Sequence, residues 1–140
     1  MSVQQWVTPS DVAHVGEVRR GLVAFAGEHG VEGAVLTDLA LAVAEIVANV
    51  ALHGSATDAI TVDADIRDEK VTVVVRGAGV GLTPNVDGPA VRMGMLIVAA
   101  LTDELHVVPK LNGGREVSMT FRRNAQRASA DDPLAPAPDQ

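Results

Sequence analysis

The stretch that decides the fold is residues 41–53, which read LAVAEIVANVALH. Across residues 39–52 every side chain is apolar except Glu45 and Asn49. A helix that is apolar on every side has no solvent face, so this segment is predicted to form a helix buried nearly all round. The four-residue step from Glu45 to Asn49 places both side chains on one face, one turn apart, so they are predicted to share one small volume.

Glu45 and Asn49 both need polar partners in such an apolar helix. Burying a carboxylate or an amide without a partner costs several kcal/mol. Two explanations follow from the residues. Either the pair lines a polar cleft that holds a ligand, or Glu45 reaches a positive side chain on another element while Asn49 bonds to a nearby backbone group. The spacing of the two residues is compatible with both.

Two helices are predicted in the first third of the chain. Apolar residues recur at three- and four-residue steps across residues 10–29, which predicts an amphipathic helix with Ser10 as its N-cap and Gly30 as its stop. Thr37 is predicted to cap the second helix, which would run from residue 38 to about residue 53.

Alternating apolar and polar residues predict two β-hairpins, with a glycine-rich loop and a third helix between them. The order helix, helix, hairpin, loop, helix, hairpin predicts an α+β fold: a two-layer sandwich whose mostly antiparallel sheet is covered on one face by helices. The predicted strands are 60–66, 71–75, 104–108 and 116–122, the loop is 77–88 and the helix is about 89–101.

Composition bounds the class of protein. A chain of 140 residues with 47% hydrophobic side chains is predicted to form one domain, residues 1–123, followed by a disordered tail, residues 124–140, poor in side chains to bury. The absence of cysteine excludes disulfides and thiol nucleophiles. A net charge of −7 and few aromatic residues oppose nucleic-acid binding. No leader-like or membrane-spanning apolar run is found, which predicts a cytoplasmic protein without membrane contact.

Residues 41–53 resemble the N-box helix of the histidine-kinase-like (GHKL, Bergerat-fold) ATPase superfamily, in the form found in bacterial anti-sigma-factor serine/threonine kinases. The resemblance continues through VVVRGAGVGL, RMGMLIVAALTDEL and NGGREVSMTF, and covers roughly residues 38–121. Each piece alone is common, but the E-x-x-x-N helix, the glycine loop and the glycine-containing helix in this order are specific. The resemblance implies ATP and Mg²⁺ as cofactors.

The resemblance also implies a role for each matching residue. Glu45 would be the catalytic general base toward a seryl or threonyl hydroxyl, and Asn49 would be the ligand of the Mg²⁺ that bridges the nucleotide phosphates. Gly79 and Gly81 would let the backbone approach the nucleotide closely. Gly94 would help the start of the third helix to face phosphate.

Two positions depart from the family pattern. The first glycine motif of the family begins with an aspartate that reads the adenine amino group, and Gly77 stands at that position. In the next motif two glycines flank one residue, whereas this chain has Arg92-Met93-Gly94. Arg92 therefore joins the predicted nucleotide-binding residues, where it could clash with the phosphates or supply them with a positive charge.

The resemblance implies a kinase that binds a sigma factor and phosphorylates a small anti-anti-sigma partner of the STAS type in a partner switch. The alternative, which Gly77 and Arg92 suggest, is a binding module of the same fold with lost or weak ATP binding. A sensor histidine kinase domain is a third reading, disfavoured because the segment between Leu82 and Gly94 is short for an ATP lid. The family also implies a homodimer.

Overall fold

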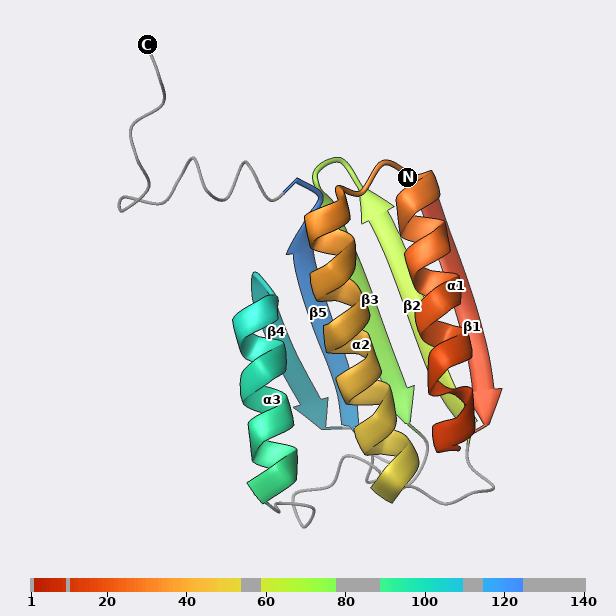
Figure 1. The fold of residues 1–140 in the computed structure, drawn as a ribbon, viewed down its shortest axis with the longest axis vertical. Coiled ribbons are helices and arrows are strands. Elements are labelled where there is room, and N and C mark those ends of the chain that lie inside the picture. Colours follow the sequence, from red (N-terminus) through yellow and green to blue (C-terminus); the bar gives the residue numbers. More distant parts are fainter. Residues whose placement is uncertain (1, 10, 54–58, 78–88, 110–114, 125–140) are drawn as a thin grey trace.

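The computed structural model describes residues 2–9, 11–53, 59–77, 89–109 and 115–124. Within them, five strands form one sheet and three α-helices lie on one of its faces (Figure 1). The elements are β1 (Ser2–Pro9), a 3₁₀ turn η1 (Val12–His14), α1 (Val15–Glu28), α2 (Gly33–His53), β2 (Ala59–Arg67), β3 (Lys70–Gly77), α3 (Pro89–Leu101), β4 (Glu104–Pro109) and β5 (Arg115–Arg122).

The sheet has the strand order β1-β2-β3-β5-β4, and every neighbouring pair is antiparallel. The helices cross it in the order α1, α2, α3, so α2 lies between the other two and over the middle of the sheet (Figure 1). The predicted α+β two-layer sandwich is confirmed. Both predicted hairpins and the helix Pro89–Leu101 are present; the helix has the predicted bounds, and no strand end differs from the prediction by more than two residues.

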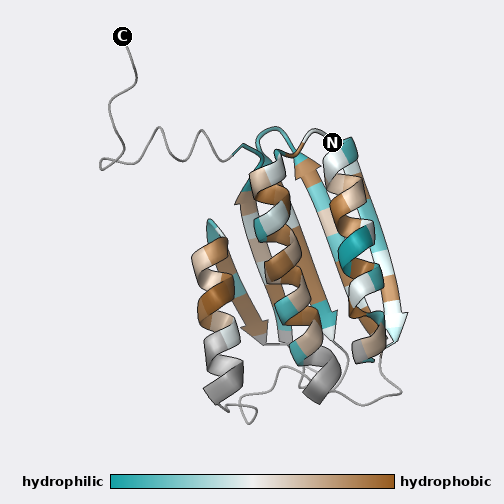
Figure 2. Cartoon of the chain, in the orientation of Figure 1, coloured by the Kyte–Doolittle hydropathy of each residue, from teal (hydrophilic) through white to brown (hydrophobic). Residues whose placement is uncertain are grey.

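The core lies between the helices and the sheet. Alternation along each strand turns one set of side chains inward, and α2 supplies the largest share from the helices because it is central. Burying one such aliphatic side chain contributes about 1.5–3 kcal/mol. Figure 2 shows hydrophobic residues running through α2 and the central strands. Fully buried examples are Leu22, Leu39, Val43, Ile46, Val62, Val73, Met119 and Phe121.

The start of α2 differs from the prediction. The helix begins at Gly33, and the Thr37 hydroxyl donates back to the Gly33 carbonyl at 3.2 Å, a bond made within the helix. The Leu36 N–H likewise donates to the Glu32 carbonyl at 2.9 Å. The prediction of Thr37 as N-cap is therefore wrong. The helix extends one turn further because Val35, only 6% exposed, joins the core.

The prediction that α2 is buried nearly all round is also wrong. Leu41 is 55% exposed, since α2 packs on the sheet with one side and faces solvent with the other (Figure 1). Ala40, Ala44 and Ala48 are only partly buried. Alanine counts as apolar in a sequence pattern but exposes little area, so an alanine-rich outer face resembles a buried one.

Helix α1 ends as predicted, because Gly30 has a φ of +82°, which a glycine adopts without strain. Its start lies later than predicted, at Val15, after the 3₁₀ turn. Asp11 supports that turn, accepting the Ala13 N–H on Oδ1 at 3.0 Å. Ser10, the predicted N-cap, lies outside the described residues.

Strand β1 was not predicted. Its valines point away from the helices, with Val3 60% and Val7 64% exposed, so its apolar pattern does not indicate the buried side. The inward anchor is Trp6, whose ring meets Phe25 edge-on at a centroid distance of 5.9 Å. Gly21 makes room for this ring, because a Cβ there would lie 2.8 Å from Trp6 Nε1. No helix in the described part of the chain is both long and apolar enough to cross a membrane.

Candidate functional site

Three elements end or begin at the same end of the molecule. The C-terminal end of α2, the C-terminal end of β3 and the N-terminal half of α3 lie together there (Figure 1). Glu45 and Asn49 are on the half of α2 that reaches this end. The connecting segments 54–58 and 78–88 lie outside the described residues. The topology therefore gathers the predicted nucleotide-binding pieces at one end of the sandwich.

Asn49 carries an unmet polar group. Asn49 is 7% exposed, and its buried Nδ2 has no hydrogen-bond partner among the described residues. An unsatisfied buried polar atom costs about 1–3 kcal/mol. Rotating the amide by half a turn exchanges its oxygen and nitrogen, so either atom can occupy this position. A buried amide with an unpartnered polar atom is typical of a residue that binds a ligand through that amide.

Glu45 lies one turn before Asn49 and is half-buried, in contact with α3. Its Oε2 approaches Gly94 so closely that a Cβ built on that glycine would lie 2.6 Å away. Within the described part of the chain, no ion pair or hydrogen bond of Glu45 is found. This observation does not support the alternative in which a positive side chain neutralises the carboxylate.

The structure thus brings together three of the predicted site residues, Glu45, Asn49 and Gly94. Gly79 and Gly81 lie outside the described residues. The backbone of Arg92 is part of the first half of α3, so the prediction that it belongs to this helix is confirmed, while its contact with phosphate stays a prediction.

Two neighbouring positions define the edge of the site. Gly77 is the last residue of β3 and pairs with Ile60 of β2, so the position of the family's aspartate falls at the end of a central strand. His53 is the last residue of α2.

A polar network lies on the face of the sheet that the helices leave uncovered, and the sequence did not predict it. Arg76 donates from Nε to Glu116 Oε1 at 2.6 Å and from Nη1 to Asp63 Oδ2, and Gln5 donates from Nε2 to Asp63 Oδ1 at 2.7 Å. Four strands therefore share one set of hydrogen bonds. The polar positions along β2 were the available signal, but the partners depend on strand order.

The network changes the acidity of its members. Burial acts to raise the pKa of Asp63, but the hydrogen bonds from Arg76 and Gln5 and the charge of Arg76 outweigh it and hold that pKa below its usual range. The hydrogen bond to Asp63 in turn raises the pKa of Arg76. The network stabilises the face of the sheet opposite the helices and is separate from the Glu45–Asn49 pair.

Comparison with known proteins places the chain in a family. Residues 8–121 match the histidine kinase-like ATPase domain, and the chain belongs to this family. Its fold is similar to that of a solved structure of the RsbU and RsbW domains of Rv1364c from Mycobacterium tuberculosis, with a TM-score of 0.70 and 21% identity over 87% of this chain and 32% of that one. The chain therefore spans about a third of that solved chain. No curated protein sequence matches it.

These comparisons confirm the superfamily and the fold that the sequence predicts. The residues present also fit the magnesium-bound nucleotide that such a family implies. Mg²⁺ prefers hard oxygen ligands and is commonly held by one or two protein groups together with phosphates and water. The buried Asn49 amide, whose Nδ2 has no partner among the described residues, can supply one such oxygen.

Proposed function

We propose that this chain binds Mg-ATP at the end of α2 and acts as an anti-sigma-factor-like serine/threonine kinase. It binds a sigma factor and phosphorylates an anti-anti-sigma partner of the STAS type. The supporting observation is the buried Asn49 amide with an unmet polar atom, one turn after a half-buried Glu45 carboxylate. The resemblance of residues 41–53 to the anti-sigma-factor kinases supports the choice of partners.

Glu45 supplies the acid–base chemistry in this proposal. Its carboxylate orients the seryl or threonyl hydroxyl of the partner and takes the hydroxyl proton on one oxygen, which makes the hydroxyl oxygen a better nucleophile. Asn49 would hold Mg²⁺ through its amide oxygen. The bound metal supplies neutralisation of phosphate charge. Because both residues stand on one rigid helix, their relative position is set before any ligand arrives.

The second candidate is a binding module of the same fold with lost or weak ATP binding. Gly77 favours it, because glycine at the end of β3 offers no side chain where the family's aspartate reads adenine. Losing a hydrogen bond to a charged group costs about 1.5–3 kcal/mol, which is roughly a ten- to hundredfold loss of affinity. Arg92, in the first half of α3, favours it too if its side chain clashes with phosphate.

One pair of measurements separates the candidates. Calorimetric titration of the full chain with Mg-ATP measures binding, and transfer of labelled phosphate to a co-purified STAS-type protein measures turnover. Binding below millimolar concentration together with transfer supports the kinase. Binding without transfer, or no binding at millimolar Mg-ATP with the partner retained, supports the binding module. Sedimentation velocity of the same sample tests the homodimer that belongs to the proposal.

A further inference from the structure

Gly94 of α3 and Glu45 of α2 make the closest helix–helix contact found at any glycine in the described part of the chain. A Cβ on Gly94 would lie 2.6 Å from Glu45 Oε2, 3.0 Å from its Cδ and 3.1 Å from its Cγ. Real Cβ atoms essentially never approach another heavy atom within 3.0 Å. The outer half of the Glu45 side chain therefore rests directly against the backbone of α3.

The backbone of α3 does not itself require a glycine here. Gly94 lies inside the helix, and among the described glycines only Gly30 has a positive φ. A glycine inside a helix is less favourable than alanine by about 0.5–1 kcal/mol. Gly94 is also buried, so solvent exposure does not explain it. The space that its missing side chain leaves is occupied by the Glu45 side chain.

We infer that Gly94 is a positioning residue for Glu45, whose carboxylate is seated in the space that the glycine leaves on α3. The inference rests on the proposed function, in which that carboxylate accepts the hydroxyl proton. It differs from the expectation that Gly94 serves the phosphates, because the group it contacts is the acid on the neighbouring helix.

A methyl group at position 94 would act on the site more than on the fold. The atoms it would meet belong to the flexible end of a glutamate, which can swing away by rotating its side chain. The fold is then retained, while the Glu45 carboxylate moves out of the space beside Gly94. The three heavy atoms nearest to such a methyl group all belong to Glu45, so the acid, and not the Asn49 amide, takes the collision. Turnover and nucleotide binding are therefore expected to separate.

The test is Gly94→Ala in the full chain, with Gly27→Ala as the matched control. A Cβ at Gly27, in α1, would meet only Leu36 Cδ1 at an ordinary 3.6 Å. Gly94→Ala is expected to lower kcat about a hundredfold, the scale of a misplaced catalytic group, and to leave KM for ATP unchanged. Gly27→Ala is expected to change neither. Unchanged kcat in Gly94→Ala, or an equal loss in ATP affinity, would overturn the inference.

A second background tests whether the effect passes through Glu45. Glu45→Asp shortens the acid by one methylene group and withdraws it from α3, so adding Gly94→Ala should lower kcat by a smaller factor than in the wild-type chain. Equal factors in the two backgrounds mean that Gly94 does not act through the acid. This comparison also excludes a general loss of structure, which would affect both backgrounds alike.

Thermal unfolding tests the contact even if the wild-type chain transfers no phosphate and the proposed function fails. In the Glu45→Ala background the collision is gone and alanine favours the helix, so Gly94→Ala should raise Tm there. In the wild-type background Gly94→Ala should raise Tm by clearly less than this, or lower it. Identical shifts in Tm in both backgrounds would show that the two residues are not coupled, and the inference would fall.

Discussion

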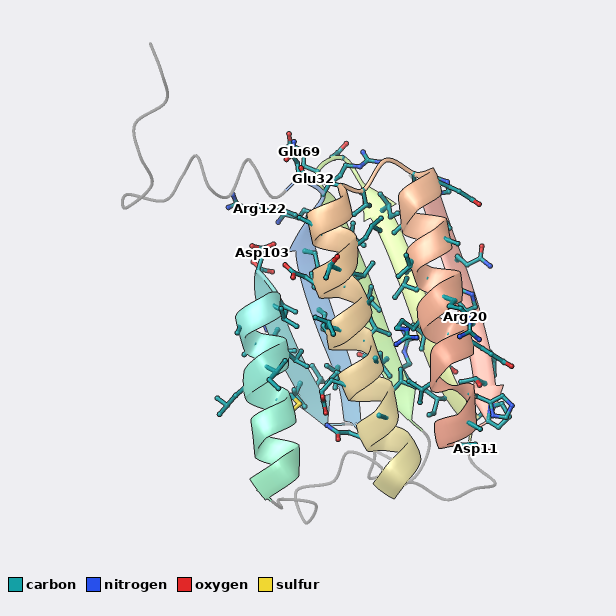
Figure 3. All side chains as sticks on the ribbon, in the orientation of Figure 1. Asp11, Arg20, Glu32, Glu69, Asp103 and Arg122 are labelled. Atoms are coloured by element: carbon teal, nitrogen blue, oxygen red, sulfur yellow. The ribbon has the colours of Figure 1, made fainter. Side chains whose placement is uncertain are left out.

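Arg123, the residue after β5, donates a hydrogen bond from Nη2 to the backbone carbonyl of His29, at the end of α1. Its Nη1 donates to the Asp68 carbonyl at 2.8 Å, and its backbone N–H donates to the Glu69 carbonyl at 2.7 Å. Its own carbonyl accepts the Glu32 N–H at 3.1 Å. One residue thus ties the α1–α2 connection to the β2–β3 turn, at the end of the molecule where Figure 3 labels Glu32 and Glu69.

Arg123→Ala is expected to lower the free energy of unfolding by about 1–3 kcal/mol, because the His29 and Asp68 carbonyl groups lose a charged donor. The Kd for Mg-ATP should not change, since Asn49 lies at the opposite end of α2 (Figure 1). Urea denaturation measures the first quantity and calorimetry the second.

The control for Arg123 is Arg67→Ala. Arg67 forms an ion pair with Asp65 at 2.8 Å, and its side chain is 62% exposed. Such an exposed pair contributes about 0–1 kcal/mol. If Arg123→Ala destabilises the chain no more than Arg67→Ala does, the linking role of Arg123 is wrong.

Glu45→Gln is expected to lower kcat by about 10² to 10⁴, the contribution of a general base, while Mg-ATP still binds. Glutamine keeps the size of the side chain, so its contact with Gly94 persists. Single-turnover phosphate transfer and calorimetry on the same preparation measure the two effects. Transfer at the wild-type rate would show that Glu45 is not the base.

Asn49→Ala is expected to abolish magnesium-dependent ATP binding without lowering Tm by the amount usual for a buried residue. The substitution removes a polar atom that has no partner among the described residues. Burying a polar atom without a hydrogen-bond partner costs about 1–3 kcal/mol. Alanine is also the better helix former. Differential scanning calorimetry with and without Mg-ATP measures both effects. A large loss of Tm in the absence of nucleotide would mean that the amide bonds within the fold.

Gly77→Asp is expected to tighten ATP binding roughly ten- to hundredfold, because it returns a charged acceptor to the position that reads adenine in the family. Gly77 is not among the glycines with positive φ, so its backbone can accept an aspartate. The measurement is a calorimetric titration with ATP, with GTP as the control that lacks the adenine amino group. Equal gains for both nucleotides would contradict adenine reading.

Asp63 predicts a pH dependence of stability. Its pKa in the folded chain lies below the ordinary value of 3.8, so ionised Asp63 stabilises the fold above that pH. The contribution is lost as the pH falls from about 3.8 through the folded pKa. Urea denaturation of the wild-type chain and of Asp63→Asn should therefore show a stability difference that shrinks below pH 4. A difference independent of pH would rule out the ionised network.

Much of the fold follows from local patterns. The two hairpins and α3 were predictable because alternation and helical periodicity repeat over a few residues, and Gly30 ends α1 through its own backbone freedom. Strand β1 was missed because Val3 and Val7 face outward, which reverses the usual relation between apolar residues and the core. The start of α2 was misplaced because burial of Val35 outweighs the capping preference of Thr37.

By itself the sequence determined that Glu45 and Asn49 share one helix face, because a four-residue step has that consequence in any α-helix. Only the tertiary structure decided that Gly94 lies against Glu45, that Arg76 joins Asp63 to Glu116, and that Asn49 is buried with an unmet polar atom. The reason is physical. Periodicity is a property of neighbouring residues, whereas contact between distant segments depends on how whole helices and strands pack together.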